Sequence, residues 1–174
     1  PGAKPYDLKV SFKPINPDGA PNVYRRSVYT FWKRTGPTPV MMALDASKRD
    51  VCTVRRERTD SASQALIMLN GTQFVETARA TADILVQNHG TTNPNDLIEE
   101  AFKKLTSRSP SERESKILQN LLEEQKKYFT DDKETEKFLK VGYYQAKAKD
   151  KKYLAAVTSL VSTLMNFDGT LSKR

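Results

Sequence analysis

Cysteine and histidine each occur only once in the 174 residues of this sequence, as Cys52 and His89. A single cysteine excludes an internal disulfide, a CxxC redox pair and a cysteine-rich zinc site. A single histidine excludes a multi-histidine metal centre, and the two counts together exclude a haem attachment sequence within this chain. We therefore expect no cofactor and no metal in the chain itself, a buried free thiol at Cys52, and His89 in a surface loop.

Long apolar runs are missing too. No stretch approaches the ~20 consecutive apolar residues that a membrane-spanning helix needs. The first ten residues, PGAKPYDLKV, contain no apolar signal core. We expect a soluble chain with no membrane span. The sequence begins with Pro1 rather than methionine, so it leaves open a signal sequence or whole domains upstream of it.

Positive charge is plentiful but unevenly distributed, with a net charge of +8. Residues 1–60 hold 12 Lys and Arg against 6 Asp and Glu, whereas residues 61–174 hold 17 against 15. The excess therefore belongs to the N-terminal third. Such a basic segment favours an acidic partner, which could be a nucleic acid, an anionic glycan or an acidic neighbouring domain.

Proline separates an N-terminal arm from the rest of the chain. Five of the nine prolines fall within residues 1–22, which predicts an extended arm that docks on a domain outside this chain. Residues 23–174 are expected to form a single, mainly α domain, an irregular bundle of about six helices. The apolar but proline-flanked stretch 37–46 is expected to be an extended, partly buried connection.

Apolar residues recur at helical spacing along most of the chain. The first such pattern predicts a helix from Asn22 to a stop at Gly36. Capping and proline signals at Asn93 and Ser109 mark the starts of two later helices. The predicted helices after the first cover 61–70, 72–88, 94–105, 110–128, 133–147 and 152–166, and the last is expected to lie at the centre of the core.

The segment CTVRRERTDSASQALIMLN, residues 52–70, joins an arginine cluster directly to a helix. Cys52 and Val54 are expected to point inward. Asp60 is a plausible N-cap for the helix, and Leu66 and Leu69 are expected on its buried face.

Arginines form the one dense polar constellation in the sequence. The candidates for an anion site are Arg25, Arg26, Arg34, Arg55, Arg56 and Arg58. The favoured interpretation is structural: the guanidinium groups, each with five donors in a fixed fork, bind the chain's own carbonyls and nearby acids such as Asp45. A second interpretation has them converge on a sulfate, phosphate or carboxylate ligand. The least favoured is a nucleic acid whose bases stack on Trp32 and its aromatic neighbours, because Trp32 lies on an apolar stripe.

Motifs for catalysis are not found. The sequence contains no GxGxxG, GxxxxGK, GxSxG or HExxH. Paired acids such as Glu99 and Glu100 fall in charged helical surfaces and are interpreted as solvated. Whether the chain takes part in an enzyme reaction is left open by these observations.

Two blocks of sequence resemble a known family. They read RRSVYTFWKRTGPTPVMMALDA and CTVRRERTDSASQALIMLN, the second followed by FVETARA. Both resemble the C-terminal domain of unknown function 1553, the planctomycete-cytochrome-associated family, and the similarity extends over nearly all of residues 23–174. The motif positions interpreted as structural are Trp32, Asp45, Cys52, Gln64 and Asn70.

The resemblance implies a context and no chemistry. Such domains form the C-terminal part of large exported bacterial proteins, often with a cytochrome-c-like haem domain upstream and sometimes a carbohydrate-binding-like insertion. We therefore expect an extracytoplasmic location, whether periplasmic, outer-surface or secreted. The expected role is that of a non-catalytic helical module docked on haem-containing or glycan-related upstream domains of the same polypeptide. A site for an anionic glycan and nucleic-acid binding are the alternatives.

Overall fold

The computed structural model describes residues 19–32, 38–47, 52, 54–55, 59, 61–90 and 93–171. Within these residues the chain is mainly helical and has no β-strand, which confirms the predicted fold class. The chain divides into two compact units, Pro1–Ile67 and Met68–Arg174, which are described separately. The arm expected at residues 1–22 lies almost entirely outside the described residues, so the predicted domain boundaries stay a prediction.

The helix predicted from Asn22 to Gly36 is wrong over its described part. Two short 3-10 turns, η1 (Asn22–Tyr24) and η2 (Ser27–Tyr29), take its place, and the backbone is extended at Arg25 and Arg26 between them. Valine, tyrosine, serine and threonine dominate this stretch, and all have weaker helix propensity than alanine or leucine. Neither turn has a side-chain cap hydrogen bond. Apolar spacing alone therefore did not suffice to form a helix.

The extended connection predicted at 37–46 is also wrong, because it contains helix α1 (Pro39–Ala43). Thr38 is extended, and Pro39 then occupies the first helical turn. Proline suits that position because its fixed φ is helical and its missing N–H would have had no intrahelical acceptor. Pro39 begins this helix, so a proline in this stretch does not exclude one.

Helix α2 (Ala62–Asn70) confirms the predicted helix 61–70. Its start is fixed by a reciprocal pair of hydrogen bonds, in which Ser61 Oγ accepts from Gln64 N and Gln64 Oε1 accepts from Ser61 N. Asp60, the predicted cap, lies outside the described residues. The predicted buried face is wrong, since Leu66 and Leu69 are exposed.

Cys52 and Val54 are exposed, so the prediction that they point inward is wrong as well. Both lie between α1 and α2 in the sequence, and neither belongs to a helix. Outside a helix or strand no periodicity defines an inner face, and a motif of adjacent apolar and cationic residues does not indicate burial.

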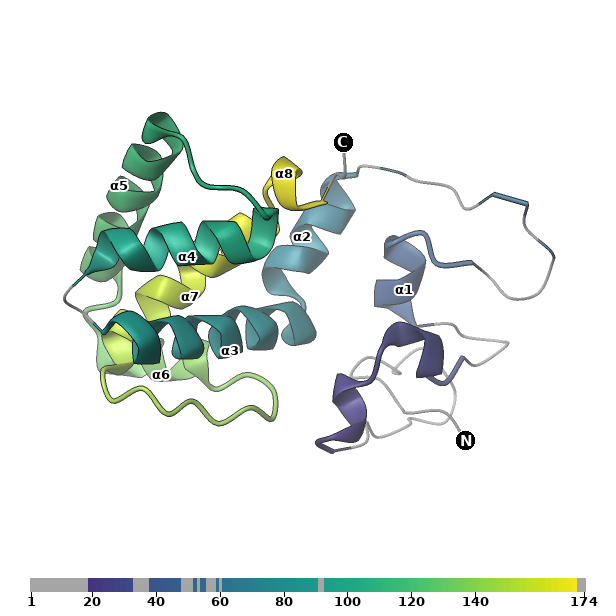
Figure 1. Ribbon diagram of the computed structural model, residues 1–174. Coiled ribbons are helices and arrows are strands. Elements are labelled where there is room, and N and C mark those ends of the chain that lie inside the picture. Colours follow the sequence, from purple (N-terminus) through teal and green to yellow (C-terminus); the bar gives the residue numbers. More distant parts are fainter. Residues whose placement is uncertain are drawn as a thin grey trace. The chain divides into compact units, whose positions relative to one another are not determined.

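The second unit is a helical bundle (Figure 1). Its elements are α3 (Thr72–His89), α4 (Pro94–Thr106), α5 (Glu112–Tyr128), α6 (Asp132–Leu139), α7 (Lys151–Met165) and α8 (Asp168–Leu171). Helix α7 contacts each of the other five. The prediction that the last long helix lies at the centre of the core is confirmed.

Helix α7 is central because its residues are apolar or small on nearly every side. Ala155, Ala156, Val157, Leu160 and Val161 are fully buried. Alanines let neighbouring helix backbones approach closely, and the larger residues interdigitate with α3 and α5. The core they share also includes Ala78, Ala82, Leu85, Leu97, Ile98, Ala101, Phe102, Leu118, Leu122 and Phe129.

Two helix limits differ from the sequence prediction. Helix α5 is capped by Ser111 and not by Ser109: Ser111 and Glu114 form a capping box. Helix α6 ends at Leu139, although the sequence predicted a helix over 133–147. Residues 140–150 instead form an irregular segment that runs alongside α3, seen in yellow-green between α6 and α7 in Figure 1.

Candidate functional site

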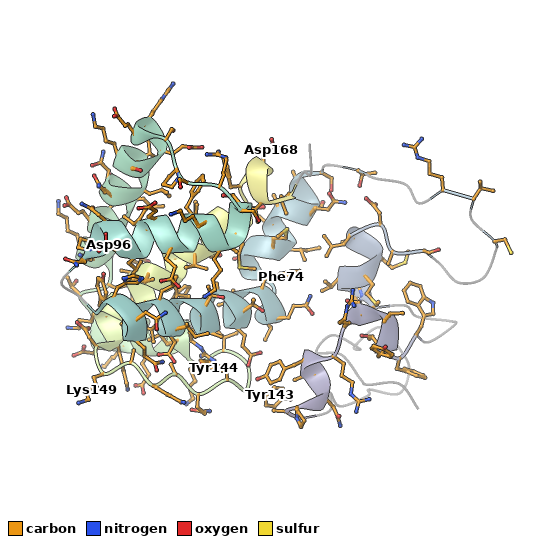
Figure 2. All side chains as sticks on the ribbon, viewed as in Figure 1. Phe74, Asp96, Tyr143, Tyr144, Lys149 and Asp168 are labelled. Atoms are coloured by element: carbon orange, nitrogen blue, oxygen red, sulfur yellow. The ribbon has the colours of Figure 1, made fainter. Side chains whose placement is uncertain are left out.

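One side of α3 carries three charged residues that are almost fully buried: Glu76, Arg79 and Asp83. Their spacing of three and four residues places them on one helical face. All three bind the segment 142–148, which follows α6, and Figure 2 shows Tyr143 and Tyr144 of that segment beside α3. The helix therefore supplies a polar face on which an irregular segment is laid.

Glu76 binds the start of this segment. Its Oε1 accepts hydrogen bonds from the backbone nitrogens of Tyr143, at 2.6 Å, and Tyr144, at 2.5 Å. Gly142, immediately before them, has φ +76, and a Cβ atom at this position would overlap the Glu76 carboxylate. Glycine is required here both by the left-handed backbone and by the closeness of the carboxylate.

Asp83 binds the end of the segment. Its carboxylate accepts from Lys147 N at 3.0 Å, Ala148 N at 2.8 Å, the Tyr144 hydroxyl at 2.7 Å and Gln87 Nε2 at 2.9 Å. Burial raises the pKa of Asp83, but these hydrogen bonds outweigh burial and hold the pKa below its ordinary value. Asp83 is thus an ionised carboxylate whose lone pairs are used in the fold.

Tyr144 is the donor that links the segment's side chains to this face. Desolvation, together with its hydrogen bond to Asp83 and the charge of that carboxylate, raises the pKa of Tyr144 to about 12. A phenol held in this way remains protonated and donates to Asp83. Neither residue is arranged as an acid or base for a substrate, because the Tyr144 proton is already donated to the Asp83 carboxylate.

Arg79 lies between the two acids and is only 4% exposed. Its Nη2 donates to the carbonyl oxygen of Tyr144 at 2.6 Å, and the guanidinium lies 6.0 Å from the centre of the Tyr144 ring. Its Nε is buried and has no hydrogen-bond partner. Among the residues that the structure describes, no carboxylate forms an ion pair with Arg79.

A pocket of about 250 Å³ opens beside Arg79. Lys140 and Lys151 contribute positive charge to its lining, Glu136 contributes one negative charge, and Leu139 and Leu154 contribute apolar surface. Glu136 lies 3.8 Å from Lys151, and both side chains are mostly exposed. The pocket therefore combines a buried guanidinium at its wall with solvated ammonium groups and an apolar side.

The arginines predicted as an anion site are only partly described. Arg25, Arg26 and Arg55 are exposed, and in the described part of the chain their side chains make no ion pair or hydrogen bond. Arg34, Arg56 and Arg58 lie outside the described residues. The structure thus neither brings the six together nor separates them.

Two residues of the predicted structural motif, Asp45 and Gln64, form hydrogen bonds with each other and with Thr59. Asp45 Oδ2 accepts from Thr59 N and Thr59 Oγ1, both at 2.7 Å, and from Gln64 Nε2 at 3.1 Å. Gln64 Nε2 also donates to Thr59 Oγ1 at 2.8 Å. This cluster ties the turn after α1, where Asp45 has φ 55, to the first turn of α2. Its polar atoms are used within the first unit.

The remaining motif residues are placed as follows. Trp32 is half-buried, and Asn70 is the last residue of α2 and exposed.

His89 is the last residue of α3 and is partly buried, so its predicted place in a surface loop is wrong. Gly90, with φ +62, caps the helix, and His89 contacts Glu100 of α4. That contact lowers the pKa of Glu100.

Within the described ranges, no cluster of three or more histidine, cysteine and acidic side chains could hold a metal ion. None of the helices described is both long and apolar enough to cross a membrane.

The apolar spacing of α3 places Val75, Ala78, Ala82 and Val86 on its inner side, but it gave no prediction of the polar face. A signal was present. Glu76, Arg79 and Asp83 each adjoin one of these apolar positions in the sequence, so they border the apolar stripe instead of lying opposite to it.

Comparison with protein families gives a clear result. The model of a family described as "Protein of unknown function (DUF1553)" matches residues 1–122, which is more than half of the chain. The chain belongs to the DUF1553 family. This confirms the family predicted from the arginine-rich blocks. The DUF1553 match includes the polar face of α3 and ends before the segment 142–148 that binds it. No curated protein and no solved structure matches the chain.

Proposed function

We propose that this DUF1553 chain is a non-catalytic helical module that docks on upstream domains of the same exported polypeptide. The observation that carries the proposal is the surface of the stretch 24–29 in the first unit. Tyr24, Val28 and Tyr29 are each more than half exposed there, and Arg25 and Arg26 between them are exposed too. We call this stretch the basic aromatic patch.

The composition of the basic aromatic patch supports docking on protein. Tyrosine and arginine are enriched in protein interfaces, where tyrosine supplies apolar area with a polar tip and arginine supplies several donors. The net positive charge of residues 1–60 adds attraction to an acidic partner. Haem-containing or glycan-related upstream domains are the proposed partners, as the resemblance of the arginine-rich blocks implies, and haem would belong to those domains.

Binding to the separately produced upstream domains tests the proposal. We expect association in the micromolar range, weakened about tenfold by a double variant Arg25→Gln and Arg26→Gln. The matched control is Lys103→Gln with Lys104→Gln, an adjacent, exposed cationic pair on α4. No association at high micromolar concentration, or equal weakening by both double variants, would reject docking through this patch.

A second candidate is a site for a sulfated or uronic glycan. The exposure of Arg25, Arg26 and Arg55 supports it, because guanidinium groups bind sulfate and carboxylate groups through paired hydrogen bonds. In this case a sulfated oligosaccharide binds and its uncharged analogue does not, and Arg55→Gln weakens binding. Binding to DNA or RNA with an affinity that falls steeply as the salt concentration rises would instead indicate a nucleic-acid partner.

The proposed location is extracytoplasmic. The full reading frame of the parent gene tests it, because a signal peptide and a haem attachment motif upstream are expected. A parent protein without either feature would contradict both the location and the haem-containing partner.

A further inference from the structure

The buried guanidinium of Arg79 lacks a full set of acceptors. It is 4% exposed, and its buried Nε has no partner. An arginine taken out of water is normally paired with an anion or fully hydrogen-bonded, because desolvating its charge is costly. The acids nearest in sequence, Glu76 and Asp83, direct their carboxylates to the backbone of 143–148.

The pocket beside Arg79 is positively charged at its rim. Lys140, Lys151 and Glu136 line it together with Arg79, so the net charge of its lining is positive. All of these groups belong to the second unit, on α3, α6, α7 and the residue after α6. A cationic wall of this kind is suited to an anion.

We propose that this pocket binds a small carboxylate with a short apolar body. The geometry that points to it is the combination of the Arg79 side chain, the two lysines and the apolar side formed by Leu139 and Leu154, all of which line the pocket. A planar guanidinium matches the two oxygens of a carboxylate. The apolar wall then accepts the carbon chain, whereas a phosphate or sulfate ion would leave that wall without a partner.

The size of the pocket sets the size of the ligand. Pockets for drug-sized ligands measure roughly 300–1,000 Å³, so about 250 Å³ holds a shorter molecule. A four-carbon acid such as butyrate supplies one carboxylate and a propyl chain. It is therefore the probe.

Titration of the 174-residue chain with sodium butyrate, at constant ionic strength made up with sodium chloride, tests the proposal. We expect saturable shifts of the Arg79 Nε–H resonance and of the Tyr144 and Ala148 amide resonances in nuclear magnetic resonance spectra. Lys140→Gln combined with Lys151→Gln should weaken butyrate binding about tenfold.

The matched control is Lys127→Gln with Lys133→Gln, which removes the same charge from exposed residues that do not line the pocket. Its affinity for butyrate should equal that of the unmodified chain. The pocket-lysine variant keeps the bond from Arg79 to Tyr144, so it tests the site without removing a buried contact.

Three results would overturn the proposal. One is the absence of any saturable shift with butyrate. Another is equal weakening by the pocket and control variants, which would mean general charge attraction. The last is a response to phosphate as large as the response to butyrate, which would reject the carboxylate and its apolar wall.

Discussion

Gly142 is the single residue on which the irregular segment after α6 depends most. Its φ of +76 and its closeness to the Glu76 carboxylate are both incompatible with a side chain. We expect Gly142→Ala to lower the free energy of unfolding by about 2 kcal/mol or more, because a left-handed alanine alone costs about 1–2 kcal/mol. Urea denaturation followed by circular dichroism measures this.

The variant Gly142→Asn separates the two causes. Asparagine tolerates a left-handed backbone better than alanine does, so Gly142→Asn would be only mildly destabilising if the backbone alone mattered. Because its Cβ also overlaps Glu76, we expect Gly142→Asn to be as destabilising as Gly142→Ala. A nearly neutral asparagine variant would show that the overlap is relieved at little cost.

At this scale the sequence predicted apolar positions better than polar ones. Val75, Ala78 and Ala82 are on the inner face of α3 as the periodicity indicated. Asp83 could not be predicted as buried, because its partners at 147 and 148 are more than sixty residues away and use backbone nitrogens, which leave no pattern in the sequence.

At the scale of elements, the N-terminus of α5 is built on charge. Ser111 and Glu114 form its capping box, and Arg108 binds the Glu114 carboxylate through Nη1 at 2.9 Å and Nη2 at 2.6 Å. These contacts, led by the bond from Arg108, lower the pKa of Glu114 from 4.5 to about 2. Folding therefore favours the ionised form of Glu114.

The pH dependence follows from the sign of that shift. Because the folded pKa is depressed, the stabilisation is complete above pH 4.5 and is lost as the pH falls towards 2. We expect Glu114→Gln to cost about 0.5–1 kcal/mol at neutral pH, and the difference from the unmodified chain to vanish near pH 2.

Urea denaturation at several pH values between 7 and 2 measures this difference. Glu112→Gln, in the same first turn and exposed, is the control and should be nearly neutral at every pH. A difference for Glu114→Gln that stays constant from pH 7 to pH 2 would contradict the assignment of Arg108 and Glu114 as a charged pair.

The helices show where local signals suffice. Asn93 and Pro94 marked the start of α4 correctly, because the signal lies within one turn of the helix. The predicted helix 133–147 ended instead at Leu139. The stop is imposed by Gly142 and by carboxylates of α3 that bind the backbone nitrogens of 143, 144, 147 and 148, which compete with helical hydrogen bonds.

For the whole molecule, the apolar core belongs to the second unit. The buried cluster extends from Ala78 to Leu164, within the unit Met68–Arg174. We expect a fragment of residues 71–174, which begins at the N-cap of α3, to fold by itself. Its thermal unfolding, followed by circular dichroism, should be cooperative, with a midpoint within about 5 °C of that of the same helices in the full chain.

Leu160→Ala provides the check on that fragment. Leu160 is fully buried in α7, and its truncation should cost about 2–5 kcal/mol in the fragment and in the full chain alike. A fragment that unfolds without a cooperative transition would show that the core needs the first 70 residues.

The way α3 holds the segment 142–148 also affects how relatives of this chain should be compared. Glu76 and Asp83 bind that segment mainly through its peptide N–H groups, which every residue except proline possesses. Substitution of the segment's side chains should therefore cost little stability, except at Gly142 and Tyr144. In an alignment of DUF1553 sequences, the acids at positions 76 and 83 of the helix should therefore be retained even where the sequence of the segment they bind has diverged.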